Sequence, residues 1–300
     1  MTTLAARPSI LENTRPGVRA RRVRNVVATV AIALSFAVAI VPLTALLVWV
    51  VSKGAGVISG AFLTQDLPIV DRFPGGGIAP AIVGTLVITG GATVLAVPLG
   101  VLGGIYLSEY GVRGPASRLI RFLAEVMTGV PSIVMGLFVY TFWVLRFKSQ
   151  TGFAGALALA SLMLPIVIRS TDEMLRLVPR DLREGSYALG ARRARTIRSV
   201  VFPHAVPGIM SGALLAVARA AGETAPLLFT IGLTKTTNFN LFGGVNTALS
   251  QQIWVNAQQP FAPAQERAFG SALTLIVLVF VFTVLARIVT AQYSRRVSAA

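Results

Sequence analysis

Long apolar runs separated by short polar segments dominate the pattern along this chain. Six of the runs are close to the roughly 20 residues that a helix needs to cross about 30 Å of hydrocarbon. Because a helix satisfies its own backbone hydrogen bonds, it is the form that such a run takes in lipid. The pattern therefore predicts an all-α polytopic membrane protein. The expected spans cover residues 26–51, 78–107, 119–142, 153–171, 205–233 and 269–291.

The composition agrees with a place in the bilayer. Hydrophobic residues make up 54% of the chain and charged residues only 13%, against about 25% charged residues in soluble domains. The chain contains no cysteine and a single histidine, His204. Disulfides, thiolate chemistry and a cysteine–histidine metal site are therefore excluded, and we expect no metal site in this chain.

The net charge of +16 is explained by topology rather than by a nucleic-acid partner. With the N-terminus inside, the inner segments hold 20 of the 27 lysines and arginines, the outer segments hold six, and Arg219 lies within a span. This positive-inside bias predicts that both termini face the cytoplasm. Residues 1–25 form a basic cytoplasmic tail that faces the lipids, and residues 26–300 form the membrane domain.

The most basic segment lies between the fourth and fifth spans, and its pattern predicts two short helices with a hinge. Asp181 suits an N-cap, and Glu184 follows at the spacing of a capping box. Gly190 can adopt the left-handed conformation that ends a helix. A second helix is predicted over 191–202, stopping before Pro203. On composition alone, an amphipathic elbow whose arginines bind lipid phosphates is equally compatible.

The same segment resembles the E-A-A-x-x-x-G-x9-I-x-L-P loop of ABC importer permeases. Glu184 and Gly190 stand at the matching spacing, followed by the sequence VVFP. Gly185 and Ser186 replace the two alanines, and Val200 and Phe202 replace Ile and Leu. The resemblance implies that the loop 173–203 docks, through its stretch 181–203, into a groove of a separate ATPase subunit. The implied coupling residues are Glu184, Ser186, Tyr187, Ala188, Leu189 and Gly190.

Three further stretches narrow the resemblance. The sequences GTLVITGGATVLAVPLGVLGGIYLSEY, MTGVPSIVMGLF and ARAAGETAPLLFTIG are similar to permease subunits of the phosphate-specific ABC importer, of the A-type. The likeness extends over residues 78–291. It implies the type I ABC importer permease fold in a bacterial cytoplasmic membrane. It also implies ATP-driven import of inorganic phosphate.

The resemblance implies several partners as well. One chain carries one coupling loop where the family needs two, so we expect a second, non-identical permease chain. A dimer of cytoplasmic ATP-binding subunits would hold ATP and magnesium, because this chain lacks the phosphate-loop sequence G-x-x-x-x-G-K-[ST]. We expect no cofactor in this chain itself. The outer loops 52–77 and 234–267 would receive an extracytoplasmic phosphate-binding protein.

Charged residues within spans need an explanation, because each costs at least about 2.5–3.5 kcal/mol on insertion scales. Arg219 is expected near the membrane midplane, and Glu223 lies on the same helix face at i+4. The pair could be a structural ion pair between packed helices. Alternatively, the forked guanidinium could bind phosphate oxygens, with Glu223 competing for it. In the resembling family the Arg and Glu of R-x-x-G-E-T lie in the conducting path.

The third span contains Pro131, which can break the helix. A half-helix beginning there would aim its free N–H groups and the Ser132 hydroxyl at an anion, although a simple packing kink is equally compatible. Glu125 could belong to the path, or could pair with Arg121 near the cytoplasmic face. The expected pathway residues are Arg219, Glu223, Thr224, Ser132, Thr128 and Glu125.

Other functions remain open at this point. The same machinery could carry molybdate, sulfate or an amino acid. An ATPase-independent secondary carrier or channel would tolerate changes in the stretch 184–190. A membrane-embedded enzyme is disfavoured, because no span pairs a nucleophile with a base, and we expect no catalytic residue.

Overall fold

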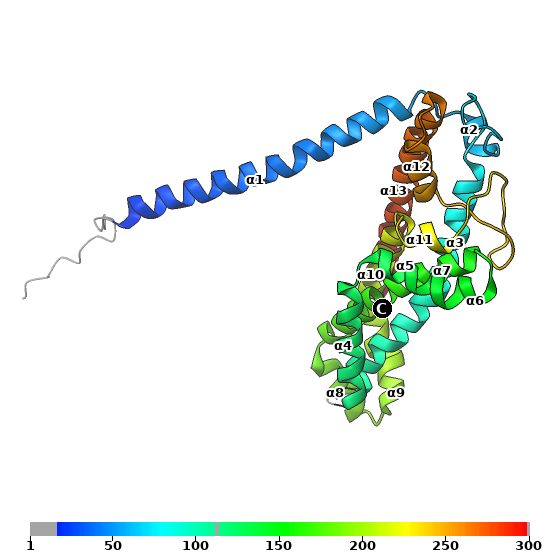
Figure 1. Ribbon diagram of the computed structural model, residues 1–300. Coiled ribbons are helices and arrows are strands. Elements are labelled where there is room, and N and C mark those ends of the chain that lie inside the picture. Colours follow the sequence, from blue (N-terminus) through cyan, green and yellow to red (C-terminus); the bar gives the residue numbers. More distant parts are fainter. Residues whose placement is uncertain (1–16, 112–113, 299–300) are drawn as a thin grey trace, which may run out of the picture. The chain divides into compact units, whose positions relative to one another are not determined.

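The computed structural model describes residues 17–111 and 114–298, and every regular element in these ranges is a helix (Figure 1). Three of the elements, labelled η, are single turns of π-helix inside or at the end of longer helices. The elements are α1 (Gly17–Gly54), α2 (Gly60–Thr64), α3 (Ala79–Ile105), η2 (Tyr106–Tyr110), α4 (Pro115–Gly129), α5 (Ser132–Val139), η3 (Tyr140–Val144), α6 (Leu145–Phe147), α7 (Gly152–Leu177), α8 (Arg180–Ala188), α9 (Arg193–Thr196), η4 (Ile197–Val201), α10 (Phe202–Ala221), α11 (Leu227–Thr230), α12 (Leu249–Ala257) and α13 (Ala262–Ser298).

Helix α1, up to Ser52, belongs to a compact unit separate from the rest of the chain. Its apolar side chains are exposed on all sides, as expected of a helix surrounded by lipid. The helix contains the span predicted over 26–51 and begins earlier, at Gly17, so the end of the predicted basic tail is helical. The rest of that tail, residues 1–16, lies outside the described residues.

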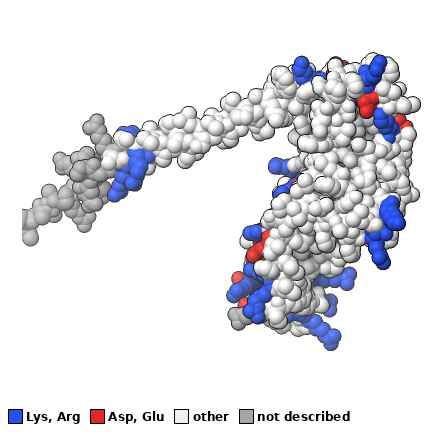
Figure 2. All heavy atoms as spheres, in the orientation of Figure 1, with Lys and Arg blue, Asp and Glu red and all other residues white. Residues whose placement is uncertain are grey.

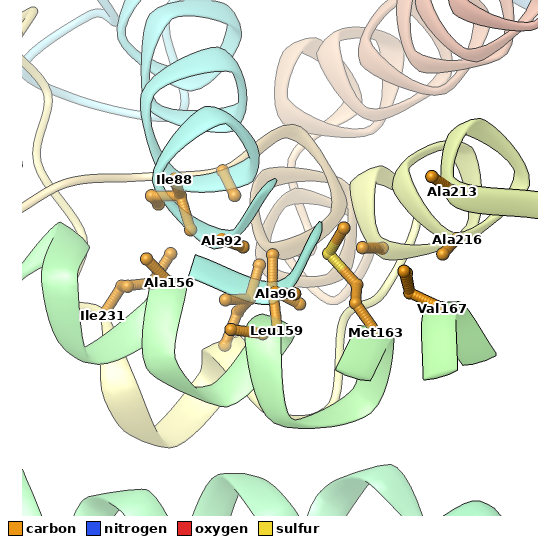
Figure 3. Close-up of a cluster of buried hydrophobic side chains, with 14 residues drawn as sticks. Ile88, Ala92, Ala96, Ala156, Leu159, Met163, Val167, Ala213, Ala216 and Ile231 are labelled. Atoms are coloured by element: carbon orange, nitrogen blue, oxygen red, sulfur yellow. The ribbon is translucent and has the colours of Figure 1, made fainter. Parts of the chain in front are cut away.

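The second unit is built around α7, which packs against both α3 and α10. Its centre is made of small and aliphatic side chains, drawn in Figure 3, among them Ile88 and Ala92 of α3 and Leu159 of α7. Glycine allows close approach of the helices: a Cβ added at Gly104 would lie 2.4 Å from Cβ of Thr171. Small residues at such interfaces are the usual means of close helix packing in membranes.

Within the described residues, five helices are long and apolar enough to cross a membrane, and the bent pair of α4 and the segment Ser132–Phe147 can supply a sixth span. The third predicted span is broken where expected, because α4 ends at Gly129, α5 begins at Ser132, and their axes differ by 107°. Val130 is extended, with a ψ of 129°, and Pro131 has no N–H to continue the helix.

The fifth span differs from the prediction of 205–233. One continuous helical rod, α9–η4–α10, runs from Arg193 to Ala221 and then ends. The expected stop before Pro203 is wrong, because Pro203 falls in the first turn of α10, after the π-turn η4, where its missing N–H is tolerated. The end at Ala221 is capped by Gly222, whose N–H bonds back to Arg219.

The two expected outer loops are joined to each other. The Leu67 N–H donates to the Lys235 carbonyl at 3.0 Å, and the Thr237 hydroxyl donates to Asp66 at 2.7 Å. Segment 234–267 is not only a loop, because it contains α12, which packs against α3 and α13. On the face shown in Figure 2, charged side chains gather over these loops and around α8 and α9 at the opposite end, with a mostly uncharged band between.

Candidate functional site

A cavity of about 230 Å³ lies where the break between α4 and α5 faces α7 and the end of α10. It brings together four of the six residues expected on a substrate path. They come from the α4–α5 break and from the end of α10, two parts of the chain that are far apart in the sequence. The lining residues are Met127, Thr128, Val130, Pro131, Ser132, Leu162, Met163, Ile166, Ala216, Arg219, Ala220 and Glu223.

Arg219 and Glu223 form a loose ion pair at this cavity. Arg219 is in the last turn of α10, and Glu223 lies just beyond the helix end, with 3.6 Å between the arginine Nε and the glutamate Oε1. This distance is too long for a hydrogen bond. The Arg219 side chain is 71% exposed and that of Glu223 only 20%. The guanidinium therefore keeps its N–H donors available for another acceptor.

The start of α5 supplies further donors. Pro131 is its N-cap residue and offers no side-chain cap, so the N–H groups of Ser132 and Ile133 have no acceptor among the described residues. The Ser132 hydroxyl lies at the same cavity. The helix dipole adds partial positive charge at this end. An anion placed between Arg219 and Ser132 could accept hydrogen bonds from the end of α10 and from the start of α5.

Thr128 and Thr224 are less suited to the expected role. The Thr128 hydroxyl donates to the Glu125 carbonyl at 2.6 Å, so its hydrogen is already used. Thr224 is not among the lining residues, and its carbonyl accepts the N–H groups of Leu227 and Leu228 at the start of α11. Thr224 therefore lies outside the cavity, although it follows Glu223 directly in the sequence.

A second cavity of about 230 Å³ shares Thr128 with the first and contains Glu125. The expected ion pair between Arg121 and Glu125 is absent from the described residues. Arg121 instead bonds the carboxylate of Asp172 on α7 and the Leu107 carbonyl, the latter at 3.0 Å. Asp172 is buried whereas Glu125 is exposed, so Asp172 depends more strongly on a counter-ion.

The other charged residues of this second cavity were missed as site residues. Arg176 pairs with Asp172 at 3.0 Å, and Arg169 pairs with Glu173 at 3.0 Å, both at i,i+4 spacing along α7. This spacing is visible in the stretch RSTDEMLR and could have indicated a charged helix face. In the sequence, these arginines indicated only the topology.

The loop between α7 and α10 has the predicted two-helix form. Gly190 has a φ of +79°, as expected of a left-handed helix end. The N-cap is Pro179 rather than the predicted Asp181, because α8 starts two residues earlier and places Asp181 in its first turn. The Ser186 and Thr196 hydroxyls lie 2.9 Å apart and join α8 to α9.

The expected docking residues of α8 are mostly uncovered. Leu189 is 91% exposed, and Tyr187 is also exposed. Glu184, Ala188 and Gly190 are exposed as well, whereas Ser186 is half-buried against α9. Leu189 and Tyr187 are therefore both accessible to a partner.

No group of three or more His, Cys, Asp or Glu side chains suited to a metal ion occurs within the described part of the chain. Two carboxylates of α7, Asp172 and Glu173, instead form the ion pairs described above.

The family described as "Binding-protein-dependent transport system inner membrane component" matches residues 96–299. The chain is 44% identical over 287 residues to phosphate transport system permease protein PstA 1 of Mycobacterium tuberculosis (strain CDC 1551 / Oshkosh), covering 94% of this chain and 93% of the relative. It is 44% identical to PstA of Mycobacterium leprae (strain TN), with 86% of each chain covered. It is 41% identical to PstA of Yersinia pestis, covering 82% of this chain and 84% of that one.

Among solved structures, the MetNI methionine ABC transporter in an inward-facing conformation aligns with a TM-score of 0.57. The alignment covers 72% of this chain and 94% of that one at 18% identity, and it shows the likeness of fold. The chain is thus a multi-pass membrane transport component with the fold of type I ABC importer permeases. It belongs to the binding-protein-dependent transport system inner membrane component family and, within it, to the PstA-type permeases.

Proposed function

We propose that this chain is the permease subunit of an ATP-driven importer that moves inorganic phosphate across the cytoplasmic membrane, with both termini in the cytoplasm. The names of its relatives support phosphate as the cargo. The observation that carries the proposal is the exposed guanidinium of Arg219 at a cavity that also contains Ser132 and the start of α5.

The chemistry of this cavity suits a transient phosphate site. A guanidinium stays charged at any relevant pH, and its planar fork matches two phosphate oxygens. Glu223 stands 3.6 Å from Arg219 and repels an anion while competing for the arginine. Such competition keeps affinity low enough for release, which a transport path requires.

Other subunits supply what this chain lacks. ATP and magnesium would bind to a PstB-type ATPase dimer, because the sequence contains no phosphate-loop motif of its own. We propose that the exposed surface of α8 and Leu189 docks onto that dimer. A PstC-type chain would be the second permease. A PstS-type binding protein would dock on the outer layer, where segments 65–78 and 231–248 are joined by hydrogen bonds.

The test of cargo is uptake by cells that lack other phosphate importers and express the whole complex. We expect uptake of radiolabelled phosphate that unlabelled phosphate abolishes and that a tenfold excess of sulfate or molybdate leaves nearly unchanged. Equal inhibition by sulfate or molybdate would contradict phosphate as the preferred cargo. Uptake that persists after the ATPase subunit is deleted would favour a secondary carrier.

A further inference from the structure

The π-helical turn η2, at the end of α3, is held by three arginines from three different elements. Arg121 of α4 donates to the Leu107 carbonyl at 3.0 Å. Arg183 of α8 donates to the Glu109 carboxylate at 2.9 Å. The guanidinium carbon of Arg193, in α9, lies 4.9 Å from the centre of the Tyr110 ring, within range of a cation–π contact. A π-turn within a helix is frequently a functional feature.

The contact between Arg183 and Glu109 is a buried ion pair. Glu109 is 5% exposed, and an unpaired carboxylate at such a site is strongly unfavourable. The same guanidinium donates to the carbonyls of Leu175 and Val178 at the end of α7, at 2.7 and 2.6 Å. A single side chain of α8 therefore holds the ends of both α3 and α7. Helix α8 therefore cannot move away from η2 without breaking the Arg183–Glu109 ion pair.

A second connection leads from η2 to the candidate site. Arg121, which binds the Leu107 carbonyl, also binds Asp172 and belongs to α4. Further along α4 is Thr128, which lines both cavities, and the helix then ends at the break before Pro131. The contacts form a continuous chain from the exposed end of α8 to the wall of the cavity that contains Arg219.

We propose that Glu109 and Arg183 are positioning residues that transmit ATPase-driven movement of α8, through η2 and Arg121, to the break in the third span. The proposal rests on the proposed function and names the elements that would convey the movement. Neither Glu109 nor Arg183 lines either cavity, so neither acts on phosphate directly. Their loss should uncouple ATP hydrolysis from transport rather than abolish hydrolysis.

The most informative change is Glu109→Gln. Glutamine has the size of glutamate and keeps one acceptor oxygen for Arg183, but it removes the charge that holds the pair. The Leu189 surface of α8 remains as it is, so docking of the ATPase should persist. We expect ATP hydrolysis near the wild-type rate, with phosphate imported per ATP reduced by about fivefold or more, the lower range of typical coupling between sites.

The experiment uses the complete complex in vesicles, supplied with binding protein and radiolabelled inorganic phosphate, with ATP hydrolysis and uptake measured in the same vesicles. Arg118→Gln is the control, because it removes an exposed charge that has no ion pair among the described residues and lies outside both cavities. It should keep the wild-type ratio. Arg183→Met also removes the donors to the Leu175 and Val178 carbonyls, so it should lower the ratio at least as far as Glu109→Gln does.

A wild-type ratio of phosphate to ATP in assembled Glu109→Gln would overturn the proposal, as would equal losses of uptake and hydrolysis. If Glu109→Gln does not assemble, Tyr110→Leu decides, because it removes the Arg193 contact at a half-exposed side chain. An unchanged ratio there would show that η2 is only structural, and a lowered ratio would support transmission. Failure of the proposed function is a separate result, since the wild-type complex itself would then import no phosphate.

Discussion

Gly136 of α5 packs directly against Pro226, which lies just after the Arg219–Glu223 pair. A Cβ added at Gly136 would lie 2.4 Å from Cα of Pro226 and 2.8 Å from its carbonyl oxygen. These are backbone atoms, which cannot turn aside as a flexible side chain can. The contact fixes the start of α5, with Ser132, relative to the end of α10, with Arg219, and so sets the width of the candidate site.

Gly136→Ala should therefore impair transport although it changes no group that touches the substrate. The added methyl forces α5 away from Pro226, and overpacking of this kind costs about 1–3 kcal/mol. We expect phosphate uptake to fall several-fold while the complex still assembles. Gly129→Ala is the control, because a Cβ there meets nothing within 4 Å. Equal uptake by the two variants would show that the site tolerates movement of α5.

Glu223→Gln should make phosphate bind more tightly and leave more slowly. The change removes the carboxylate that competes for Arg219 across 3.6 Å. We expect KM for uptake to fall by roughly tenfold, equivalent to about 1.4 kcal/mol, and the maximal rate to fall with it. Uptake as a function of phosphate concentration separates the two effects. A raised KM would mean that Glu223 holds the site in shape rather than competing with the anion.

Leu189→Asp should release the ATPase. The side chain is 91% exposed, so the charge leaves the fold unchanged, whereas a buried apolar anchor at an interface is often worth about 2 kcal/mol or more. We expect much less ATPase to co-purify with the permease and uptake to be lost. Phe239→Asp, which is also exposed but lies in the outer layer, should keep the ATPase bound. Normal uptake by Leu189→Asp would favour the secondary carrier.

Gly84→Ala should destabilise the core rather than alter the mechanism. A Cβ at this position would lie 1.9 Å from the Thr247 carbonyl oxygen, where α3 meets the segment before α12. We expect a loss of about 1–3 kcal/mol in the free energy of unfolding, seen as a lower midpoint of thermal unfolding in detergent. Gly90→Ala, on the same helix, meets nothing within 4 Å and should be neutral or slightly stabilising.

Features that depend on local sequence were predictable. The break at Pro131 follows from a missing N–H, the left-handed Gly190 from the lack of a Cβ, and the pairing of Arg219 with Glu223 from helical spacing. The family could also be identified from the sequence, because its motifs occupy short continuous stretches.

Features that depend on distant contacts were not predictable in this way. Arg121 has Glu125 four residues away, yet it pairs with Asp172, 51 residues along the chain, because only the packing of α4 on α7 brings that buried carboxylate within reach. The end of α10 at Ala221 was also missed. The apolar pattern continues beyond it, and it is the turn at Gly222 that ends the helix.

The central claim is that Arg219 binds phosphate on its way through the membrane, and the most direct measurement is uptake by Arg219→Gln. Arg118→Gln is the matched control, because it removes an exposed arginine outside both cavities. Losing a charged hydrogen-bond donor costs about 1.5–3 kcal/mol, so uptake by the assembled Arg219→Gln complex should fall roughly 10- to 100-fold. Arg118→Gln should transport normally. Wild-type uptake by an assembled Arg219→Gln complex would contradict the account and leave Arg219 as a structural partner of Glu223.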